Sequence, residues 1–167
     1  MEVGISLGSN LGDRLANLRD AKRRMAAMPQ GRIVAQSPVY ETEPVGVKPE
    51  YRHLAFLNAI LIVEAECKVH DCFDHLHDIE DVMGRRRSLD RYDPRPIDLD
   101  IIYAGDLHIE SGGLVIPHPH WAQRRFVLQP LADVRPHLVL PGQTRTVAEI
   151  LAALPQAEAV TLLTRDW

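Results

Sequence analysis

A ten-residue apolar run, FLNAILIVEA at residues 56–65, is the feature that most restricts the fold. It is too short and too rich in β-branched residues for a helix, so it predicts a buried strand. Two further runs, VGISL at 3–7 and IDLDIIYA at 97–104, also have strand character, and residues 33–42 are rich in strand-forming side chains. The sequence therefore predicts a sheet of four strands.

Two segments between these strands have helical periodicity. Apolar residues recur at spacings of three and four between residues 15 and 28, and Asp13 is placed to act as the N-cap. A second apolar stripe runs through residues 69–83 and ends at Gly84. The resulting order β-α-β-β-α-β predicts an α+β fold of the ferredoxin-like type, with an antiparallel sheet and the helices packed on it.

The last third of the chain predicts a helical and loop extension of the same domain. The turn at Gly105-Asp106 suggests a short hairpin partner at 107–109, and a helical segment is expected at 121–128. In TVAEILAAL, residues 146–154, Thr146 and Glu149 have capping-box spacing ahead of an apolar stripe. We expect residues 1–167 to form a single domain.

Composition excludes several classes of protein. Apolar residues make up 46% and charged residues 25% of the 167-residue chain, which is typical of globular domains. No apolar run approaches the ~18 residues of a membrane span, and the N-terminus lacks a secretory pattern. We expect a cytoplasmic protein that works as a monomer. Cys67 and Cys72 fit neither a disulfide framework nor a zinc site, so they are interpreted as two reduced structural thiols.

The distribution of charge indicates the kind of ligand. The net charge is −4, which disfavours nucleic acid as a partner. Residues 64–81 carry seven acids against one lysine, whereas residues 84–95 carry five arginines against two aspartates. A cationic loop on an acidic protein suggests a small polyanion as ligand.

Asp98 and Asp100 lie two residues apart in a predicted strand. Residues i and i+2 project to the same side of a strand, so the two carboxylates are directed at one place. Two carboxylates about 4 Å apart repel by roughly 4 kcal/mol at an effective dielectric near 20, and a partly buried site must offset this with cations or a shared proton. Oxygen ligands of this kind suit Mg²⁺, which completes its shell with water and substrate phosphate.

A plainer interpretation is that these aspartates form surface ion pairs with Arg91 and Arg95, contributing less than about 1 kcal/mol. However, two carboxylates cannot neutralise five arginines, and guanidinium groups commonly bind phosphate in a bidentate manner. Neither a P-loop nor a GxGxxG fingerprint is present, so arginines and Mg²⁺ would have to hold any phosphate.

The stretch RYDPRPIDLDII, residues 91–102, resembles the signature of the 6-hydroxymethyl-7,8-dihydropterin pyrophosphokinase family of folate biosynthesis. Five more pieces are similar to that family in the same order: GSNLGD (8–13), YETEPVG (40–46), FLNA (56–59), IPHP (116–119) and RRFVLQPL (124–131). The resemblance implies a ferredoxin-like enzyme that transfers the terminal diphosphate of ATP, its co-substrate, to the hydroxymethyl group of the dihydropterin and releases AMP.

The resemblance also implies roles for particular residues. Asp98 and Asp100 would coordinate two Mg²⁺ ions and, with Arg85 and Arg95, are the expected catalytic residues. Segment 84–95 would close over the phosphates as a lid. The expected ATP contacts are Glu80, Arg87, Arg91, Tyr92, Arg95, Ile101, His118 and Arg124.

For the pterin, the resemblance implies an aromatic sandwich between Phe56 and Phe126 and amide hydrogen bonds from Asn58. Backbone groups of the segment that contains Thr42, Glu43 and Val45 would complete this site. Taken alone, Phe56 in an apolar strand would be interpreted as a core residue; the resemblance favours stacking.

Three positions depart from the family pattern. Asp93 stands where Gly or Ala is usual, Ser88 where a basic residue occurs, and Pro119 where an aromatic is common. Asp93 therefore places an anion in the expected phosphate lid. A different class, a ferredoxin-like RNA-binding module, lacks support because the chain has no aromatic RNP-type strand and a negative net charge.

Overall fold

The computed structural model describes residues 1–44, 48–86, 88–90, 93–156 and 158–167. Its main sheet has the order β5-β1-β4-β3-β8, with β2 also paired to β4, and every pairing among these strands is antiparallel. The strands are β1 (Glu2–Ser9), β2 (Gly31–Gln36), β3 (Val39–Thr42), β4 (Phe56–Ala65), β5 (Asp98–Ala104) and β8 (Val160–Thr164). The predicted antiparallel sheet is thus confirmed.

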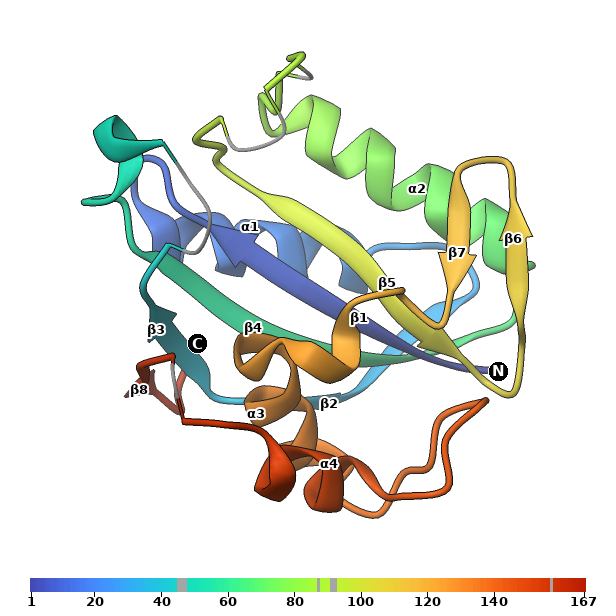
Figure 1. The fold of residues 1–167 in the computed structure, drawn as a ribbon. Helices are drawn as coiled ribbons and strands as arrows, with labels where there is room; N and C mark the ends of the chain where they lie inside the picture. The colour runs from blue at the N-terminus through green and yellow to red at the C-terminus, as the bar shows by residue number, and fades with distance from the viewer. Residues whose placement is uncertain (45–47, 87, 91–92, 157) are drawn as a thin grey trace.

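Four helices and two 3₁₀ turns cover this sheet. The α-helices are α1 (Arg14–Ala26), α2 (Val69–Val82), α3 (Arg125–Val134) and α4 (Val147–Ala153), and the turns are η1 (Pro49–Tyr51) and η2 (Trp121–Gln123). Figure 1 shows α1 and α2 on one face of the sheet and α3 and α4 on the other. The predicted caps are confirmed: Asp13 accepts from the Ala16 N–H at 3.0 Å, and Thr146 with Glu149 forms the capping box.

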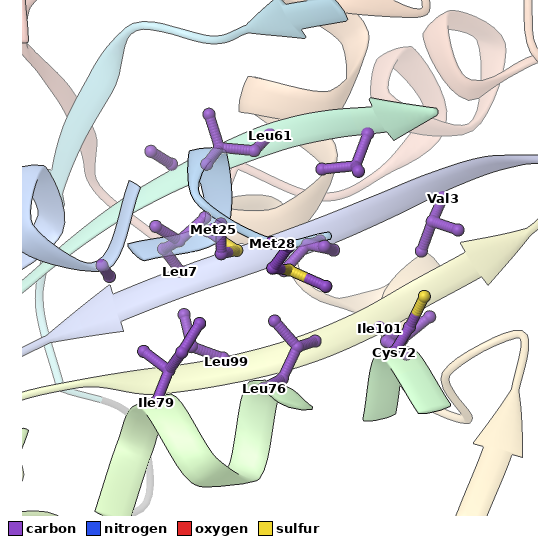
Figure 2. Packing of buried hydrophobic residues seen from close by; sticks show 14 of the residues in the cluster. Val3, Leu7, Met25, Met28, Leu61, Cys72, Leu76, Ile79, Leu99 and Ile101 are labelled. Carbon is purple, nitrogen blue, oxygen red and sulfur yellow. The ribbon is translucent and has the colours of Figure 1, made fainter. Parts of the chain in front are cut away.

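Alternation along β1, β4 and β5 separates two hydrophobic cores. Residues Val3, Ile5 and Leu7 of β1 face α1 and α2, where they meet Leu76 and Ile79 of α2. Figure 2 shows these α2 side chains directed at the strands. On the other face, β4 and β5 pack against α3 and α4 through Ile60, Ile62, Ile102, Tyr103, Leu128 and Leu131.

Some predicted elements differ from the structure. The 33–42 strand is divided into β2 and β3 at Ser37-Pro38, where Pro cannot donate a ladder hydrogen bond and the Ser37 hydroxyl accepts from the Ile60 N–H at 2.8 Å. The hairpin partner predicted at 107–109 is wrong, because β6 (Ile109–Ser111) pairs with β7 (Leu114–Ile116) instead. The 121–128 helix is in fact η2 followed by α3, and β8 was not predicted.

No helix among the described residues is long and apolar enough to cross a membrane.

Candidate active site

Small residues on β1 form the floor of a cavity. Gly4, Ser6 and Gly8 alternate along the strand and face the α3 side, opposite to the core residues between them. Ser6 pairs with Asp100 and Gly8 with Asp98 across the β1–β5 ladder. The Tyr103 ring fills the space above Gly4. Ser6 and Gly8, which carry little or no side chain, leave space above the sheet and line the cavity.

The cavity has a volume of about 610 Å³. Its walls come from β1, β3, β4, β5, the segment after α2, the region around η2 and α3, and the segment before β8. The lining residues are Ser6, Gly8, Thr42, Glu43, Phe56, Asn58, Arg85, Arg95, Asp98, Asp100, His118, His120, Gln123, Arg124, Phe126 and Glu158. Eleven of the residues expected from the sequence are therefore brought together in one place.

The predicted pairing of Asp98 and Asp100 on one face is found. Asp98 Oδ1 accepts from Arg85 Nη1 at 2.7 Å, and Asp98 Oδ2 lies 3.5 Å from Arg95 Nε. Asp100 opens onto the cavity but is otherwise enclosed by protein, and this burial, together with the charges of Asp98 and Glu80, raises the pKa of Asp100 to about 7. Asp98 thus pairs with Arg95, as the plainer interpretation expects, and also with Arg85, whereas the predicted partner Arg91 lies outside the described residues.

Glu80 lies behind this pair. It is almost fully buried, accepts from the Leu99 N–H at 2.7 Å and forms an ion pair with Arg85. Burial raises the pKa of Glu80, with the Leu99 hydrogen bond and Arg85 acting in the opposite direction. Glu80 does not line the cavity, so its predicted contact with ATP stays a prediction.

Cationic and neutral donors surround the carboxylates. Arg85, Arg95 and Arg124 reach the cavity from three segments of the chain. His118 accepts the His120 N–H at 3.2 Å through Nδ1, which leaves Nε2 as the donor of a neutral ring. Burial, followed by the charge of Arg124, lowers the pKa of His118 to about 4, so the ring is neutral at physiological pH.

Aromatic and amide groups also line the cavity, and around Gly8 the side chains of Asn58 and Phe56 lie next to that of Asp98. Asn58 Nδ2 donates to Thr42 Oγ1 at 2.7 Å, which fixes the amide with its oxygen beside Gly8. Phe56 and Phe126 both line the cavity and are only partly buried, so neither is a simple core residue. The Arg124 guanidinium lies 5.7 Å from the centre of the Phe126 ring, a cation–π contact.

Not every predicted residue can be placed at the cavity. The side chain of Ile101 packs in the core on the α1 and α2 face, so any nucleotide contact there would have to come from its main chain. Val45, Arg87, Arg91 and Tyr92 lie outside the described residues. Sequence reasoning missed Ser6, Gly8, His120, Gln123 and Glu158; only the first two left a signal, the alternation of small residues in GISLG.

Two of the departures from the family pattern contact each other. The Ser88 hydroxyl donates to a carboxylate oxygen of Asp93, and Asp93 also accepts from the Tyr51 hydroxyl at 3.5 Å. Lys48 forms an ion pair with Asp90. The segment after α2 is thereby attached to η1 and the residue before it, and the anionic side chain of Asp93 is engaged by hydroxyl groups.

The fold and cavity define a small mixed α/β protein in which arginines surround a pair of carboxylates. Residues 4–136 match the sequence profile of the family described as 7,8-dihydro-6-hydroxymethylpterin-pyrophosphokinase. The chain belongs to this family. It is an ATP-dependent pyrophosphokinase of folate biosynthesis.

Relatives of similar length carry the corresponding name. The chain is 38% identical to the 2-amino-4-hydroxy-6-hydroxymethyldihydropteridine pyrophosphokinase of Pseudomonas aeruginosa, over 92% of this chain and 91% of that one. The Methylorubrum extorquens enzyme of the same name is 39% identical, with 90% and 91% covered. A folate synthesis bifunctional protein of Arabidopsis thaliana is 43% identical over 80% of this chain but only 27% of its own length.

Solved structures support the fold. The wild-type HPPK-DHPS of Plasmodium falciparum, crystallised with pterin and p-hydroxybenzoate, matches with a TM-score of 0.68 at 16% identity, covering 90% of this chain and 41% of that one. The present chain thus spans about two fifths of that larger protein.

Proposed function

We propose that the cavity above β1 is where diphosphate passes from ATP to 6-hydroxymethyl-7,8-dihydropterin. The observation that carries this proposal is that Asp98 and Asp100 on β5 share one cavity with three arginines and with the aromatic and amide side chains of Phe56, Phe126 and Asn58. The charged groups suit a polyphosphate, and the aromatic and amide groups next to Asp98 suit a flat heterocycle.

The carboxylate end fits Mg²⁺. The donors are oxygens on a strand, and burial together with the charges of Asp98 and Glu80 raises the pKa of Asp100, so a cation bound there would favour its ionised form. Asp98 and Asp100 would hold two ions, whose chemistry is to neutralise the phosphates and polarise the reacting oxygens. Arg85 now bridges Glu80 and Asp98, so it would exchange Asp98 for phosphate oxygens when metal and nucleotide enter.

The arginines supply the remaining phosphate contacts. Arg85, Arg95 and Arg124 approach from different elements, and guanidinium groups bind phosphate oxygens in a bidentate manner. His118 would donate from its neutral ring, which recognises the nucleotide without adding charge. In this proposal Arg87, Arg91 and Tyr92 complete the lid, Glu80 orients Arg85, and Ile101 contributes main-chain contacts.

The pterin would lie between Phe56 and Phe126. Asn58, held by Thr42, presents its amide oxygen and second N–H to the edge of the ring, and the neighbouring Glu43 and Val45 would complete that edge. The hydroxymethyl oxygen then forms a bond to the β-phosphorus, and the bridge to the α-phosphate breaks with its oxygen leaving on AMP. The protein contributes by positioning both substrates and excluding water.

We further propose that residues 1–167 form one domain with a ferredoxin-like core. The order β1-α1-β2/β3-β4-α2-β5 and the sheet order β5-β1-β4-β3 support that classification. The monomeric state, the cytoplasmic location and the absence of nucleic-acid and membrane partners stay predictions. A mass of twice the chain mass in size-exclusion chromatography with light scattering would contradict the monomeric state.

The nucleotide product tests the reaction. Incubation with ATP, Mg²⁺ and 6-hydroxymethyl-7,8-dihydropterin should yield AMP and the dihydropterin diphosphate, whereas ADP would rule out diphosphate transfer. Asp98→Asn and Asp100→Asn should reduce turnover by at least about a thousandfold, as expected when a transition-state electrostatic contact is lost. Both variants should remain folded by circular dichroism.

A binding measurement separates metal coordination from a structural role. Calorimetry with a non-hydrolysable ATP analogue should show Mg²⁺-dependent affinity in the parent protein and little Mg²⁺ dependence in either Asn variant. Asp106→Asn, in the turn after β5, is a matched control that should behave like the parent. If the parent, the two Asn variants and the Asp106→Asn control all show equal Mg²⁺ dependence, Asp98 and Asp100 have a purely structural role.

A further inference from the structure

The two cysteines lie together at the end of the sheet remote from the active site. Cys67 follows β4, Cys72 lies in the first turns of α2, and their sulfur atoms are 2.8 Å apart. Asn58 at the cavity and Ala65 at the far end of β4 are seven residues apart, so at about 3.3 Å per strand residue they are about 23 Å apart, and Cys67 follows in the turn after Ala65. The established reaction makes no use of these thiols.

The surroundings hold this pair in place. The Glu66 N–H donates to the Gln30 carbonyl at 2.9 Å, which anchors the turn that carries Cys67. The Cys72 N–H donates to the Lys68 carbonyl at 3.1 Å, which fixes the first turn of α2. Figure 2 shows Cys72 directed into the core beside Ile101. A disulfide bond length of about 2.05 Å is therefore within reach of small side-chain rotations.

The two thiols differ in access. Cys72 is buried, with a side chain enclosed by the core, whereas Cys67 is only partly buried. Cys67 also lines a second cavity, of about 610 Å³, with Arg32, Glu64 and Glu66. Arg32 and Glu64 form an ion pair with each other at 2.8 Å, and Glu66 adds a further acid, so this lining is polar and suits a small hydrophilic molecule more than a hydrophobic one.

We propose that Cys67 and Cys72 form a reversible intramolecular disulfide by exchange with a low-molecular-weight peptide disulfide. The Cys67 thiolate attacks one sulfur of the small disulfide, forming a mixed disulfide and releasing one thiol. The Cys72 thiolate then attacks Cys67 Sγ, closing the protein disulfide and releasing the second thiol. The two cysteines lose two electrons and two protons, and the small disulfide gains them.

The order of attack follows from burial. Burial, and then the neighbouring Cys67, raise the pKa of the Cys72 thiol to about 12, so Cys72 is a poor initial nucleophile. Its attack becomes effective once Cys67 holds a mixed disulfide, because the two sulfurs are already adjacent. Cys67 is thus the entry residue and Cys72 the resolving residue.

Intact-mass analysis of the full chain tests this proposal, with glutathione disulfide as the probe. After incubation and acid quenching, the protein should lose the mass of two hydrogen atoms, carry no retained glutathione and resist alkylation at both cysteines when denatured. Dithiothreitol should restore both the original mass and the alkylation of both cysteines. A protein that keeps one glutathione, or in which both cysteines remain open to alkylation, would overturn the proposal.

Two matched variants assign the steps. Cys72→Ser should accumulate a stable glutathione adduct at Cys67, because the resolving thiol is absent. Cys67→Ser should acquire at least tenfold less adduct over the same time, since Cys72 is buried. Rapid adduct formation at Cys72 in the Cys67→Ser protein would contradict the assigned order. Amide hydrogen exchange should also slow in residues 67–72 of the oxidised parent, and unchanged exchange would argue against a closed bond.

Discussion

Glu80 of α2 accepts a hydrogen bond from the backbone N–H of Leu99 in β5 at 2.7 Å. This contact joins the helix to the strand that carries both aspartates, and Leu99 lies between them in the sequence. The same carboxylate forms an ion pair with Arg85, which in turn contacts Asp98. One buried side chain thus fixes both the strand and an arginine that faces the active site.

Replacing Glu80 with Ala should destabilise the protein by about 2–4 kcal/mol, because a buried N–H loses its acceptor and a cavity is created. Glu80→Gln should cost less, since its carbonyl oxygen can still accept from Leu99. Urea denaturation measures both effects. If Gln proves as costly as Ala, the contribution of Glu80 comes from its charge and its pairing with Arg85.

The Asp100 carboxyl predicts an unusual pH dependence of stability. Its folded-state pKa is raised to about 7, so between about pH 4 and 7 the folded protein binds more protons than the unfolded chain. Without divalent ions, the free energy of unfolding attributable to this group should therefore fall as pH rises through that range. Urea midpoints measured in EDTA should show a steeper fall for the parent than for Asp100→Asn. Superimposable pH profiles would contradict the raised pKa.

Substitutions at Phe56 can distinguish stacking on the pterin from packing in the core. Its ring lines the cavity, so Phe56→Ala should raise the KM for the dihydropterin by about tenfold or more, equivalent to about 1.4 kcal/mol. Phe56→Leu retains apolar volume but lacks the aromatic face. A Leu variant that resembles Ala in KM supports stacking, whereas one that matches the parent assigns Phe56 to packing alone. The KM for ATP is the internal control in both variants.

The Ser88 and Asp93 side chains should restrain the segment after α2. The Asp90 N–H donates to Ser88 Oγ at 3.0 Å and the Asp93 N–H to the Asp90 carbonyl at 3.1 Å. Ser88→Ala and Asp93→Ala should each speed amide exchange at these positions severalfold. Both changes remove the Ser88–Asp93 contact, but Ser88→Ala alone also removes the acceptor of the Asp90 N–H, and Asp93→Ala alone the contact with Tyr51. The double variant should therefore exceed either single variant by less than the sum of the two effects. Additive effects would show that the two side chains act independently.

Sequence reasoning succeeded where local pattern and tertiary environment agree. The run 56–65 coincides with β4, because its short length and its β-branched residues allow few other structures. The helix caps at Asp13 and Thr146 were also predicted, because they depend on neighbouring residues only. The shared face of Asp98 and Asp100 followed from strand geometry alone. The resemblance to the family then supplied the roles of residues whose own pattern is uninformative, such as Asn58.

Long-range contacts account for what was missed. The strand β8 is short and half exposed, and it forms because β3 offers a free edge, which no local pattern indicates. The burial of Glu80 could not be inferred from its place among seven acids, since the deciding partner, Leu99, is nineteen residues away. The proximity of Cys67 and Cys72 similarly depends on how the turn after β4 enters α2.

Ser6 and Gly8 of β1 give the cavity a floor made largely of main chain. A Cβ at Gly8 would approach Asn58 Oδ1 to 3.3 Å, so even one methyl group would press on the amide that we propose contacts the pterin. At Gly4 the same atom would lie 2.2 Å from the Tyr103 ring. The depth of the cavity is consequently set by the small size of the β1 side chains. Larger replacements at Ser6 or Gly8 would make the cavity shallower without changing the charged groups that line it.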